Sequence, residues 1–154
     1  MSGSRSDYSV LMSVYKNDKV PFLNDAIASM VNQTVPFHDM VLVCDGPLGV
    51  ELNSCIDAWR KSLGTKLNVV RLAENNGLGY ALNAGLPECG CELVARMDSD
   101  DISRVDRCEK LLAQMERLVL LLLYSICLEA ITVDTWVLMA VVVISLIKKL
   151  VIQQ

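Results

Sequence analysis

Segments with the pattern of buried strands alternate with segments of helical pattern over the first three quarters of the chain. No other feature restricts the fold as strongly. Each of four short apolar runs rich in β-forming residues is followed by a stretch with apolar residues at helical spacing. The predicted strands lie within residues 8–15, 39–47, 66–72 and 91–97, and the predicted helices within residues 21–31, 52–63, 74–86 and 103–116.

This alternation predicts an α/β fold, in which helices cover both faces of a parallel sheet. Ligands bind to such sheets beyond the carboxyl ends of the strands. Polar sequences follow all four predicted strands, and three of them bring carboxylates: "YKND", "CDG", "RLAENNG" and "MDSDD". The topology therefore predicts a binding site at one edge of the sheet.

Three carboxylates fall within four positions of the stretch "ELVARMDSDDISR", at Asp98, Asp100 and Asp101. Clustered carboxylates repel one another unless a cation lies among them. Mg²⁺ and Mn²⁺ prefer such oxygen ligands and are often shared with the phosphates of a substrate. In an extended loop Asp98 and Asp100 point the same way, with Ser99 turned aside, so we predict that these two bind a divalent metal. The alternative is a solvated loop in which an Asp caps a helix.

Other residues near this edge are candidate ligand-binding residues, and each also has a simpler structural interpretation. Asp45 is placed to accept a hydrogen bond from a base or ribose, or merely to stabilise a turn. Asn76 and Gly77 belong to a glycine-marked turn that matches neither a dinucleotide-binding fingerprint nor a P-loop. Asn83 follows one turn into the next helix and is either a site residue or an exposed amide. Arg96 pairs with a diphosphate or neutralises the acidic residues.

The charge distribution argues against nucleic-acid binding. Residues 1–116 carry eleven Lys or Arg residues against sixteen Asp or Glu residues, a net charge of −5, with no basic stripe. Six cysteines lack the closely spaced Cys and His pairs of zinc frameworks, and the single histidine, His38, is interpreted as a surface loop residue. We expect reduced thiols and a cytoplasmic protein without a signal peptide.

The composition changes near residue 117, which predicts a domain over residues 1–116 and an apolar, helical tail over residues 117–154. The tail has two apolar runs, residues 118–128 and 136–147, each shorter than the roughly 20 residues that cross a bilayer. It is interpreted as a membrane-lying segment at the inner face of the cell membrane, a degenerate sequence from a shifted reading frame, or a helix that packs on a partner.

Five ordered segments together resemble the family 2 glycosyltransferases of the GT-A fold, which is Rossmann-like, and in particular bacterial enzymes that build surface polysaccharides. The resemblance covers about residues 9–116, and its segments are "SVLMSVYKND", "AIASMVNQT", "MVLVCDGP", "LNVVRLAENNGLGYALNAGL" and "ELVARMDSDDISRVDRCEKLLAQME". It implies transfer of a sugar from a UDP-, GDP- or dTDP-linked donor to a carbohydrate acceptor, with Mn²⁺ or Mg²⁺ as cofactor.

The resemblance also implies roles for individual residues. Val14 and Tyr15 would flank the base of the nucleotide, and Asp45 would bind it. Asn76, Gly77 and Asn83 would line the donor site. Asp98, Ser99 and Asp100 would form the D-x-D motif, with Asp100 as the direct metal ligand. The metal would neutralise charge on the leaving diphosphate.

The sequence departs from the family pattern at two places. "ISRVDR" lacks the proline that usually precedes its aspartate, and nothing after Glu116 resembles the acceptor half with its carboxylate general base. We therefore expect a donor-binding half, truncated and of uncertain catalytic competence. The alternatives are a non-catalytic nucleotide-sugar-binding or membrane-attached module and, more remotely, a response-regulator-like domain, for which a lone phosphoacceptor Asp and a downstream Lys are missing.

Overall fold

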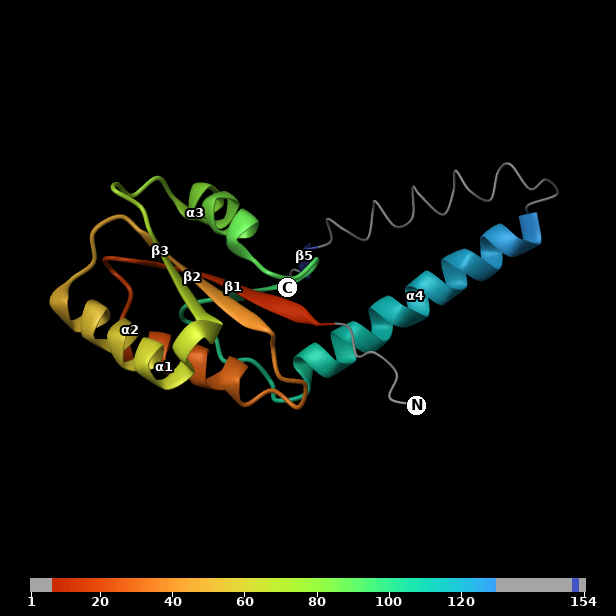
Figure 1. Ribbon diagram of the computed structural model, residues 1–154, viewed down its shortest axis with the longest axis horizontal. Coiled ribbons are helices and arrows are strands. Elements are labelled where there is room, and N and C mark those ends of the chain that lie inside the picture. The colour runs from red at the N-terminus through yellow and green to blue at the C-terminus, as the bar shows by residue number, and fades with distance from the viewer. Residues whose placement is uncertain (1–6, 130–150, 153–154) are drawn as a thin grey trace.

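The computed structural model describes residues 7–129 and 151–152, and its centre is a twisted parallel sheet between layers of helices (Figure 1). The strands of the sheet are β1 (Tyr8–Tyr15), β2 (Asp39–Asp45), β3 (Leu67–Arg71), β4 (Leu93–Asp98) and the two-residue β5 (Val151–Ile152). They lie in the order β3-β2-β1-β4-β5, and every neighbouring pair is parallel. The predicted α/β parallel-sheet fold is confirmed.

The strand order places a change of direction beside β1. From β1 the chain builds outward through β2 and β3, and it then returns to the other side of β1 with β4. Such a switch point is where open parallel sheets bind ligands. The register pairs Ser13 of β1 with Asp98 of β4, and Tyr15 of β1 with Asp45 of β2. The carboxyl ends of three strands therefore meet at one edge.

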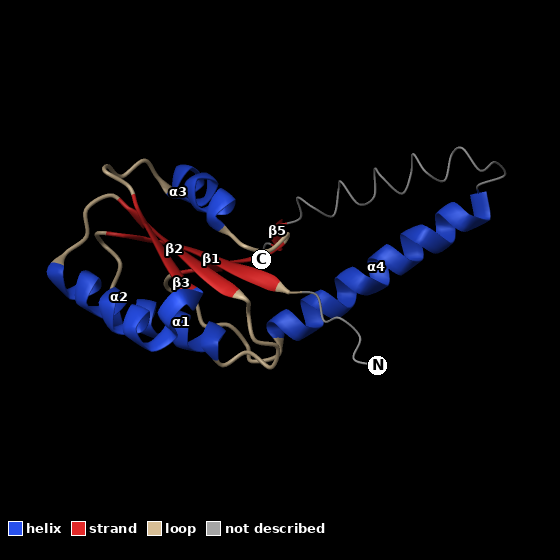
Figure 2. Cartoon of the chain, viewed as in Figure 1, coloured by secondary structure: helices blue, strands red, loops and turns tan. Residues whose placement is uncertain are grey.

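Helices α1 (Val20–Val31) and α2 (Val50–Leu63) lie on one face of the sheet, and α3 (Leu78–Gly85) lies on the other (Figure 2). Pro21 stands in the first turn of α1, where its missing N–H leaves no bond unmade. α2 ends at Gly64, whose φ of 59° suits a residue without a Cβ atom. The bounds of α1 and α2 agree with the sequence-based expectation to within two residues, whereas α3 begins four residues later than the predicted range 74–86.

Alternation along β1 divides the core between the two faces. The side chains of Val10, Met12 and Val14 join the larger cluster under α1 and α2, whereas Leu11 joins a smaller cluster under α3. α3 approaches the sheet closely, because a Cβ atom on Gly85 would lie 2.5 Å from Val43 Cγ2. The short helix is therefore packed directly against the strands that lead to the carboxyl edge.

The fourth helix differs from its predicted bounds of 103–116. α4 spans Arg107–Glu129, so it begins four residues later and continues through the change of composition at residue 117. Ser103 does not belong to the helix, and its N–H donates instead to Ser29 Oγ of α1 over 3.0 Å. Gln33, just after α1, accepts the Cys108 N–H and donates to the carbonyl of Arg104. These two hydrogen bonds hold the first turn of α4 next to the end of α1.

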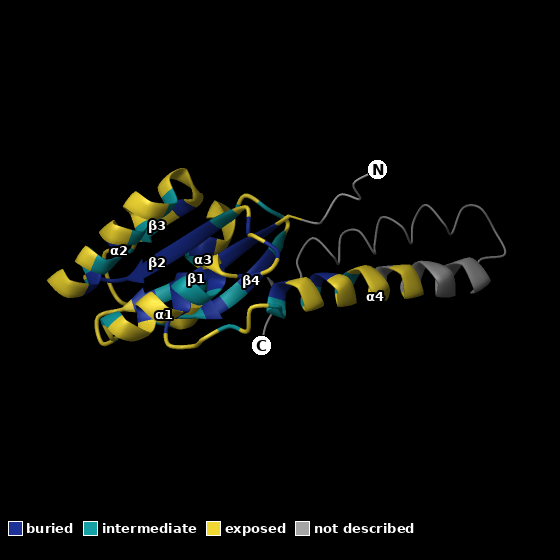
Figure 3. Cartoon of the chain, turned by 90° about the horizontal axis from the view of Figure 1, so that it is seen from below, coloured by how far each residue is buried: buried dark blue, intermediate teal, exposed yellow. Residues whose placement is uncertain are grey.

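Beyond its first turns, the described part of α4 up to residue 121 is largely exposed (Figure 3). Cys108 and Leu112 are buried against the domain, whereas Leu118, Leu120 and Leu121 are more than half exposed. None of the helices in residues 7–129 is long and apolar enough to cross a membrane. Most of the predicted tail, including its second apolar run, lies outside the described residues, so the boundary at residue 117 stays a prediction.

Candidate functional site

A cleft of about 480 Å³ opens at the carboxyl edge of the sheet, where the strand order changes direction. This volume lies within the range of small-molecule sites in proteins. Its walls come from the ends of β1, β2 and β4 and from the loop before α3. The lining residues are Ser13, Tyr15, Asp18, Asp45, Asn75, Gly77, Leu78, Asp98, Ser99 and Asp100.

Asp45 builds one wall of the cleft through its carboxylate. The side chain is buried at the end of β2, where Oδ1 accepts the Asn76 N–H over 2.9 Å and Oδ2 accepts the Gly77 N–H over 3.0 Å. Gly77 has a φ of 88°, a left-handed conformation that favours glycine. Asp45 therefore fixes the loop before α3, and binding of a base by its remaining lone pairs stays a prediction.

The backbone of the loop before α3 passes close to position 46, which explains why a glycine follows Asp45. Gly46 has a φ of 84°, and a Cβ atom there would lie 2.7 Å from the backbone nitrogen of Asn75. An alanine would thus be strained in its own dihedral angle and would also push the loop away. The Asp-Gly pair at the end of β2 is a structural requirement of the cleft.

Asp18 is a site residue to which the sequence analysis assigned no role. Its Oδ2 atom accepts the Tyr15 N–H over 3.0 Å and the hydroxyl of Ser99 over 2.8 Å. Ser99 is buried, and its hydroxyl joins the end of β4 to the loop after β1. Its role in ligand binding stays a prediction. The carboxylate in "YKND" was the available signal, since it follows a predicted strand that ends at this edge.

Arg96 and Asp98 form an ion pair across the α3 face of β4. The Arg96 Nη2 atom lies 2.7 Å from Asp98 Oδ1, with the side chains 19% and 35% exposed. Among the described residues the buried Nε atom of Arg96 has no hydrogen-bond partner. This ion pair is the neutralisation that one interpretation of Arg96 expected, and its pairing with a diphosphate stays a prediction. Asp100 is exposed at the cleft, and its carboxylate forms no hydrogen bond or ion pair with the described residues.

Four of the predicted site residues do not line the cleft. Val14 is fully buried in the core under α1 and α2, because strand alternation turns it away from Ser13 and Tyr15. Asn76 and Asn83 are exposed, and the Asn76 amide donates to the carbonyl of Glu74 over 3.2 Å. Arg96 lies in a neighbouring groove. The six that do line the cleft are Tyr15, Asp45, Gly77, Asp98, Ser99 and Asp100.

The cleft is strongly acidic. Its lining residues include four carboxylates and no lysine or arginine, and Arg96 pairs with one of the four from outside. Carboxylate oxygens suit a hard divalent cation, which often takes one or two ligands from protein carboxylates and the rest from water and phosphates. Asp98 and Asp100 fit that arrangement. Within the described residues the one group of three potential ligand side chains within 4.8 Å of each other is His38, Asp39 and Cys91.

Comparison of sequences connects this arrangement with known proteins. The profile of Glycosyl transferase family 2 matches residues 9–129. A UDP-Gal:alpha-D-GlcNAc-diphosphoundecaprenol beta-1,3-galactosyltransferase of Escherichia coli is 43% identical over 117 residues, 76% of this chain and 42% of the relative. The amylovoran biosynthesis glycosyltransferase AmsE of Erwinia amylovora is 42% identical over 109 residues, 71% of this chain and 40% of the relative.

Comparison of structures gives the same fold. S. aureus TarS in complex with UDP superposes with a TM-score of 0.62 at 23% identity, over 72% of this chain and 32% of that protein. The mannosyltransferase PcManGT from Pyrobaculum calidifontis, in complex with GDP-Man and Mn²⁺, gives a TM-score of 0.55 at 21% identity, over 64% of this chain and 28% of that protein. The chain spans about two-fifths of the length of the first two relatives by sequence.

Proposed function

The chain belongs to glycosyl transferase family 2, and we propose that its acidic cleft binds a nucleotide-diphosphate sugar through a divalent metal. In this proposal the described domain is the donor-binding half of a glycosyltransferase for bacterial surface polysaccharides. The sugar would pass to a carbohydrate acceptor, which the described residues do not identify.

The acidity of the cleft is the observation that carries this proposal. Four carboxylates line a space of about 480 Å³ without a lysine or arginine. A diphosphate is itself anionic, so its approach to these side chains is repulsive in the absence of a cation. A divalent ion between the two sets of oxygens turns this repulsion into attraction. Metal and nucleotide are therefore expected to bind together, each weakly without the other.

The residues divide this work between them. Asp100 is exposed and unpaired among the described residues, so we assign it as the direct metal ligand, with Asp98 beside it and held by Arg96. Tyr15 is 40% exposed at the end of β1 and offers an aromatic face to the base. Mn²⁺ or Mg²⁺, when bound, would stabilise the negative charge on the leaving diphosphate.

Four further residues keep secondary roles. Val14 can flank the base only through its main chain, because its side chain is in the core. The backbone N–H groups of Asn76 and Gly77 donate to the Asp45 carboxylate. We therefore expect them to shape the cleft and not to donate to the nucleotide. Asn83 is exposed on α3 outside the cleft wall, and a role in donor binding would need a longer ligand that reaches it.

The names of the similar proteins guide the choice of donor. UDP is named for the Escherichia coli galactosyltransferase and for the TarS complex, and GDP for the mannosyltransferase complex. We propose UDP-linked sugars ahead of GDP- and dTDP-linked ones because the first of these relatives is 43% identical. Five described cysteines are free thiols, which supports synthesis at the cytoplasmic side of the membrane.

Thermal unfolding tests the binding step. UDP, GDP and dTDP are each added with Mn²⁺, with EDTA, and to the protein without metal. A ligand at 100 times its dissociation constant stabilises the native state by about 2.7 kcal/mol. We expect UDP with Mn²⁺ to raise the melting temperature and UDP with EDTA to leave it unchanged. Asp101→Asn should behave like the parent, because Asp101 is also exposed but does not line the cleft.

A turnover assay separates the enzyme from a binding module. The chain covers 42% of its Escherichia coli relative, so its own competence for transfer is part of the proposal. Release of UDP from a UDP-sugar in the presence of Mn²⁺ and a carbohydrate acceptor would assign a transferase. Metal-dependent binding without release would assign a nucleotide-sugar-binding module. Loss of both would contradict the proposed function.

A further inference from the structure

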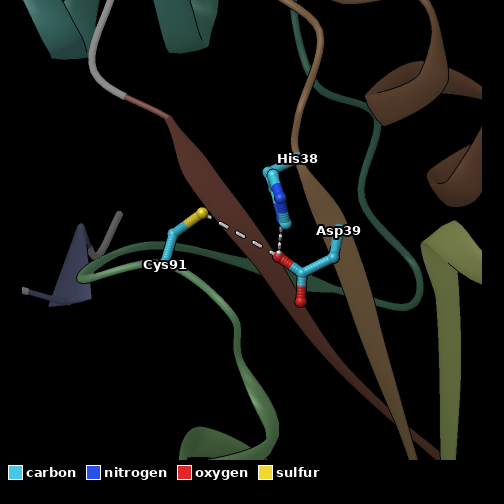
Figure 4. Close-up of side chains that lie close together, drawn as sticks. All are labelled: His38, Asp39 and Cys91. Carbon is cyan, nitrogen blue, oxygen red and sulfur yellow. Dashed lines mark hydrogen bonds and ion pairs between the residues drawn. The ribbon is translucent and has the colours of Figure 1, made fainter.

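Three side chains with metal-binding atoms meet at the opposite end of the sheet from the acidic cleft (Figure 4). His38 directly precedes β2, Asp39 opens it, and Cys91 lies two residues before β4. Figure 4 shows the imidazole and the thiol approaching the carboxylate of Asp39 from two sides. The sequence separates Cys91 from the other two by more than fifty positions, so no motif announces this group.

The spacing of the three groups is close to that of a tetrahedral metal site. The Asp39 Oδ1 atom lies 3.2 Å from His38 Nδ1 and 4.0 Å from Cys91 Sγ. With standard zinc bond lengths, tetrahedral ligands lie roughly 3.3 Å apart for nitrogen and oxygen and roughly 3.5 Å apart for sulfur and oxygen. The ligand atoms of all three side chains lie within 4.8 Å of one another. Side-chain shifts of roughly 1 Å would therefore bring them around one ion.

The central carboxylate is already held in position. Ser9 Oγ donates to Asp39 Oδ1 over 2.6 Å, and the Gly90 N–H donates to Oδ2 over 3.0 Å. The Cys91 N–H in turn donates to Ser9 Oγ over 3.0 Å. Metal sites commonly use such outer hydrogen bonds to orient their ligands. One serine here connects two members of the group.

The electrostatics of the group favour a cation. Burial and then the Asp39 charge raise the pKa of the Cys91 thiol, against a hydrogen bond from Ser9 that lowers it. The charges that act on Cys91 and on the adjacent Cys89 thiol come from Asp39, Asp7 and Glu88, all of them acidic. The His38 Nδ1 atom lies 3.2 Å from Asp39 Oδ1, so the Nδ1–H tautomer donates a hydrogen bond to this carboxylate. A metal ion bound by both atoms would take the place of that hydrogen.

The arrangement does not suit nucleophilic catalysis. In a thiol nucleophile the imidazole contacts the sulfur and removes its proton. Here the carboxylate of Asp39 stands between the imidazole and the thiol, with hydrogen bonds to both (Figure 4). A raised thiol pKa also keeps the sulfur protonated at neutral pH. Metal coordination is the chemistry that uses all three side chains.

We propose that His38, Asp39 and Cys91 bind one Zn²⁺ ion, with water in the fourth position. A thiolate, an imidazole and a carboxylate suit zinc better than Mg²⁺ or Mn²⁺, which prefer oxygen ligands. On binding, the thiol releases its proton to solvent and the S–Zn bond forms without any redox change. The ion would fasten the chain before β4 to the start of β2. Since β1 spans eight residues, roughly 26 Å, it acts apart from the nucleotide cleft.

Cobalt is the probe for this site. Co²⁺ is added to the reduced protein, and a thiolate-to-cobalt charge-transfer band is recorded in the near ultraviolet. We expect one equivalent of Co²⁺ to produce the band, and one equivalent of Zn²⁺ to remove it. Cys91→Ser should abolish the band. Cys89→Ser and Cys55→Ser are matched controls and should retain it, because neither thiol belongs to the group. Asp100→Asn should also retain it.

A second variant guards against misfolding of Cys91→Ser. The His38 side chain is 58% exposed, so His38→Ala should preserve the fold. Loss of one of three protein ligands should weaken Co²⁺ binding at least tenfold. The proposal is overturned if the parent gives no band with Co²⁺, if the band persists in Cys91→Ser, or if His38→Ala binds Co²⁺ as tightly as the parent. Each of these results is independent of nucleotide binding.

Discussion

The hydroxyl of Ser99 donates a hydrogen bond to Asp18 Oδ2 over 2.8 Å, and this contact joins the end of β4 to the loop after β1. The two residues are 81 positions apart in sequence. Asp18 also receives the Tyr15 N–H, so one carboxylate fixes both strand ends at the cleft. Removal of either partner should therefore affect stability and ligand binding together.

Ser99→Ala should lower the free energy of unfolding by about 1 kcal/mol, the typical net contribution of one hydrogen bond. The side chain is 8% exposed, so water replaces the lost contact poorly. Ser54→Ala is the matched control, because that hydroxyl donates to the Val50 carbonyl on the exposed side of α2. Urea denaturation measures the free energy of unfolding of both variants. Equal effects of the two substitutions would argue that the contact between Ser99 and Asp18 adds nothing to the fold.

The two aspartates of the predicted metal pair should respond differently to removal of charge. Asp98→Asn leaves the guanidinium of Arg96 without its carboxylate partner and should cost about 1.5–3 kcal/mol. Asp100→Asn removes a repulsive charge from an exposed side chain and should change stability by less than about 0.5 kcal/mol. Chemical denaturation without metal distinguishes them. Clear destabilisation by Asp100→Asn would contradict the role proposed for that residue.

Two glycines in α3 should respond to alanine with opposite signs. Gly85→Ala places a methyl group 2.5 Å from Val43 Cγ2 and 2.6 Å from Leu11 Cδ1, and such overpacking costs about 1–3 kcal/mol. Gly79→Ala meets nothing within 4 Å and should stabilise the helix by about 0.5–1 kcal/mol. Thermal unfolding of both variants checks the sign. A stabilising Gly85→Ala would mean that α3 packs less closely on the sheet.

Asp45→Ala should destabilise the domain by about 1.5–3 kcal/mol, because it leaves the N–H groups of Asn76 and Gly77 without their charged acceptor. Asp57→Ala is a control on the exposed side of α2 and should stay within about 0.5 kcal/mol of the parent. Hydrogen exchange of the Asn76 and Gly77 amides locates the effect. Unchanged exchange rates in Asp45→Ala would refute the structural role of this carboxylate.

The strands and the position of the cleft were predictable from the sequence because both depend on local pattern. β-forming runs located β1 to β4, and parallel topology brought their carboxyl ends together. The start of α4 was wrong because it is fixed by a tertiary contact. Gln33, just after α1, accepts the Cys108 N–H, and the sequence near residue 107 does not indicate this hydrogen bond.

Site residues were predictable where orientation follows from a strand, and less so elsewhere. Period-two alternation places Ser13 and Tyr15 at the cleft and Val14 in the core, a consequence the resemblance alone did not supply. The position of Asp18 after a predicted strand placed it at the edge, but its role there depends on a contact with Ser99 that the local sequence does not show. The approach of Cys91 to Asp39 depends on the path of the loop before β4, which local sequence pattern does not determine.

The most direct test of the account is isothermal titration calorimetry of UDP into the parent and into Asp100→Asn, each with Mn²⁺ and with EDTA. We expect the parent to bind UDP only with Mn²⁺, Asp100→Asn to lose this binding at unchanged stability, and Asp101→Asn to retain it. Binding of UDP to the parent in EDTA, or equal binding by the parent and Asp100→Asn in Mn²⁺, would contradict the proposed metal and diphosphate site.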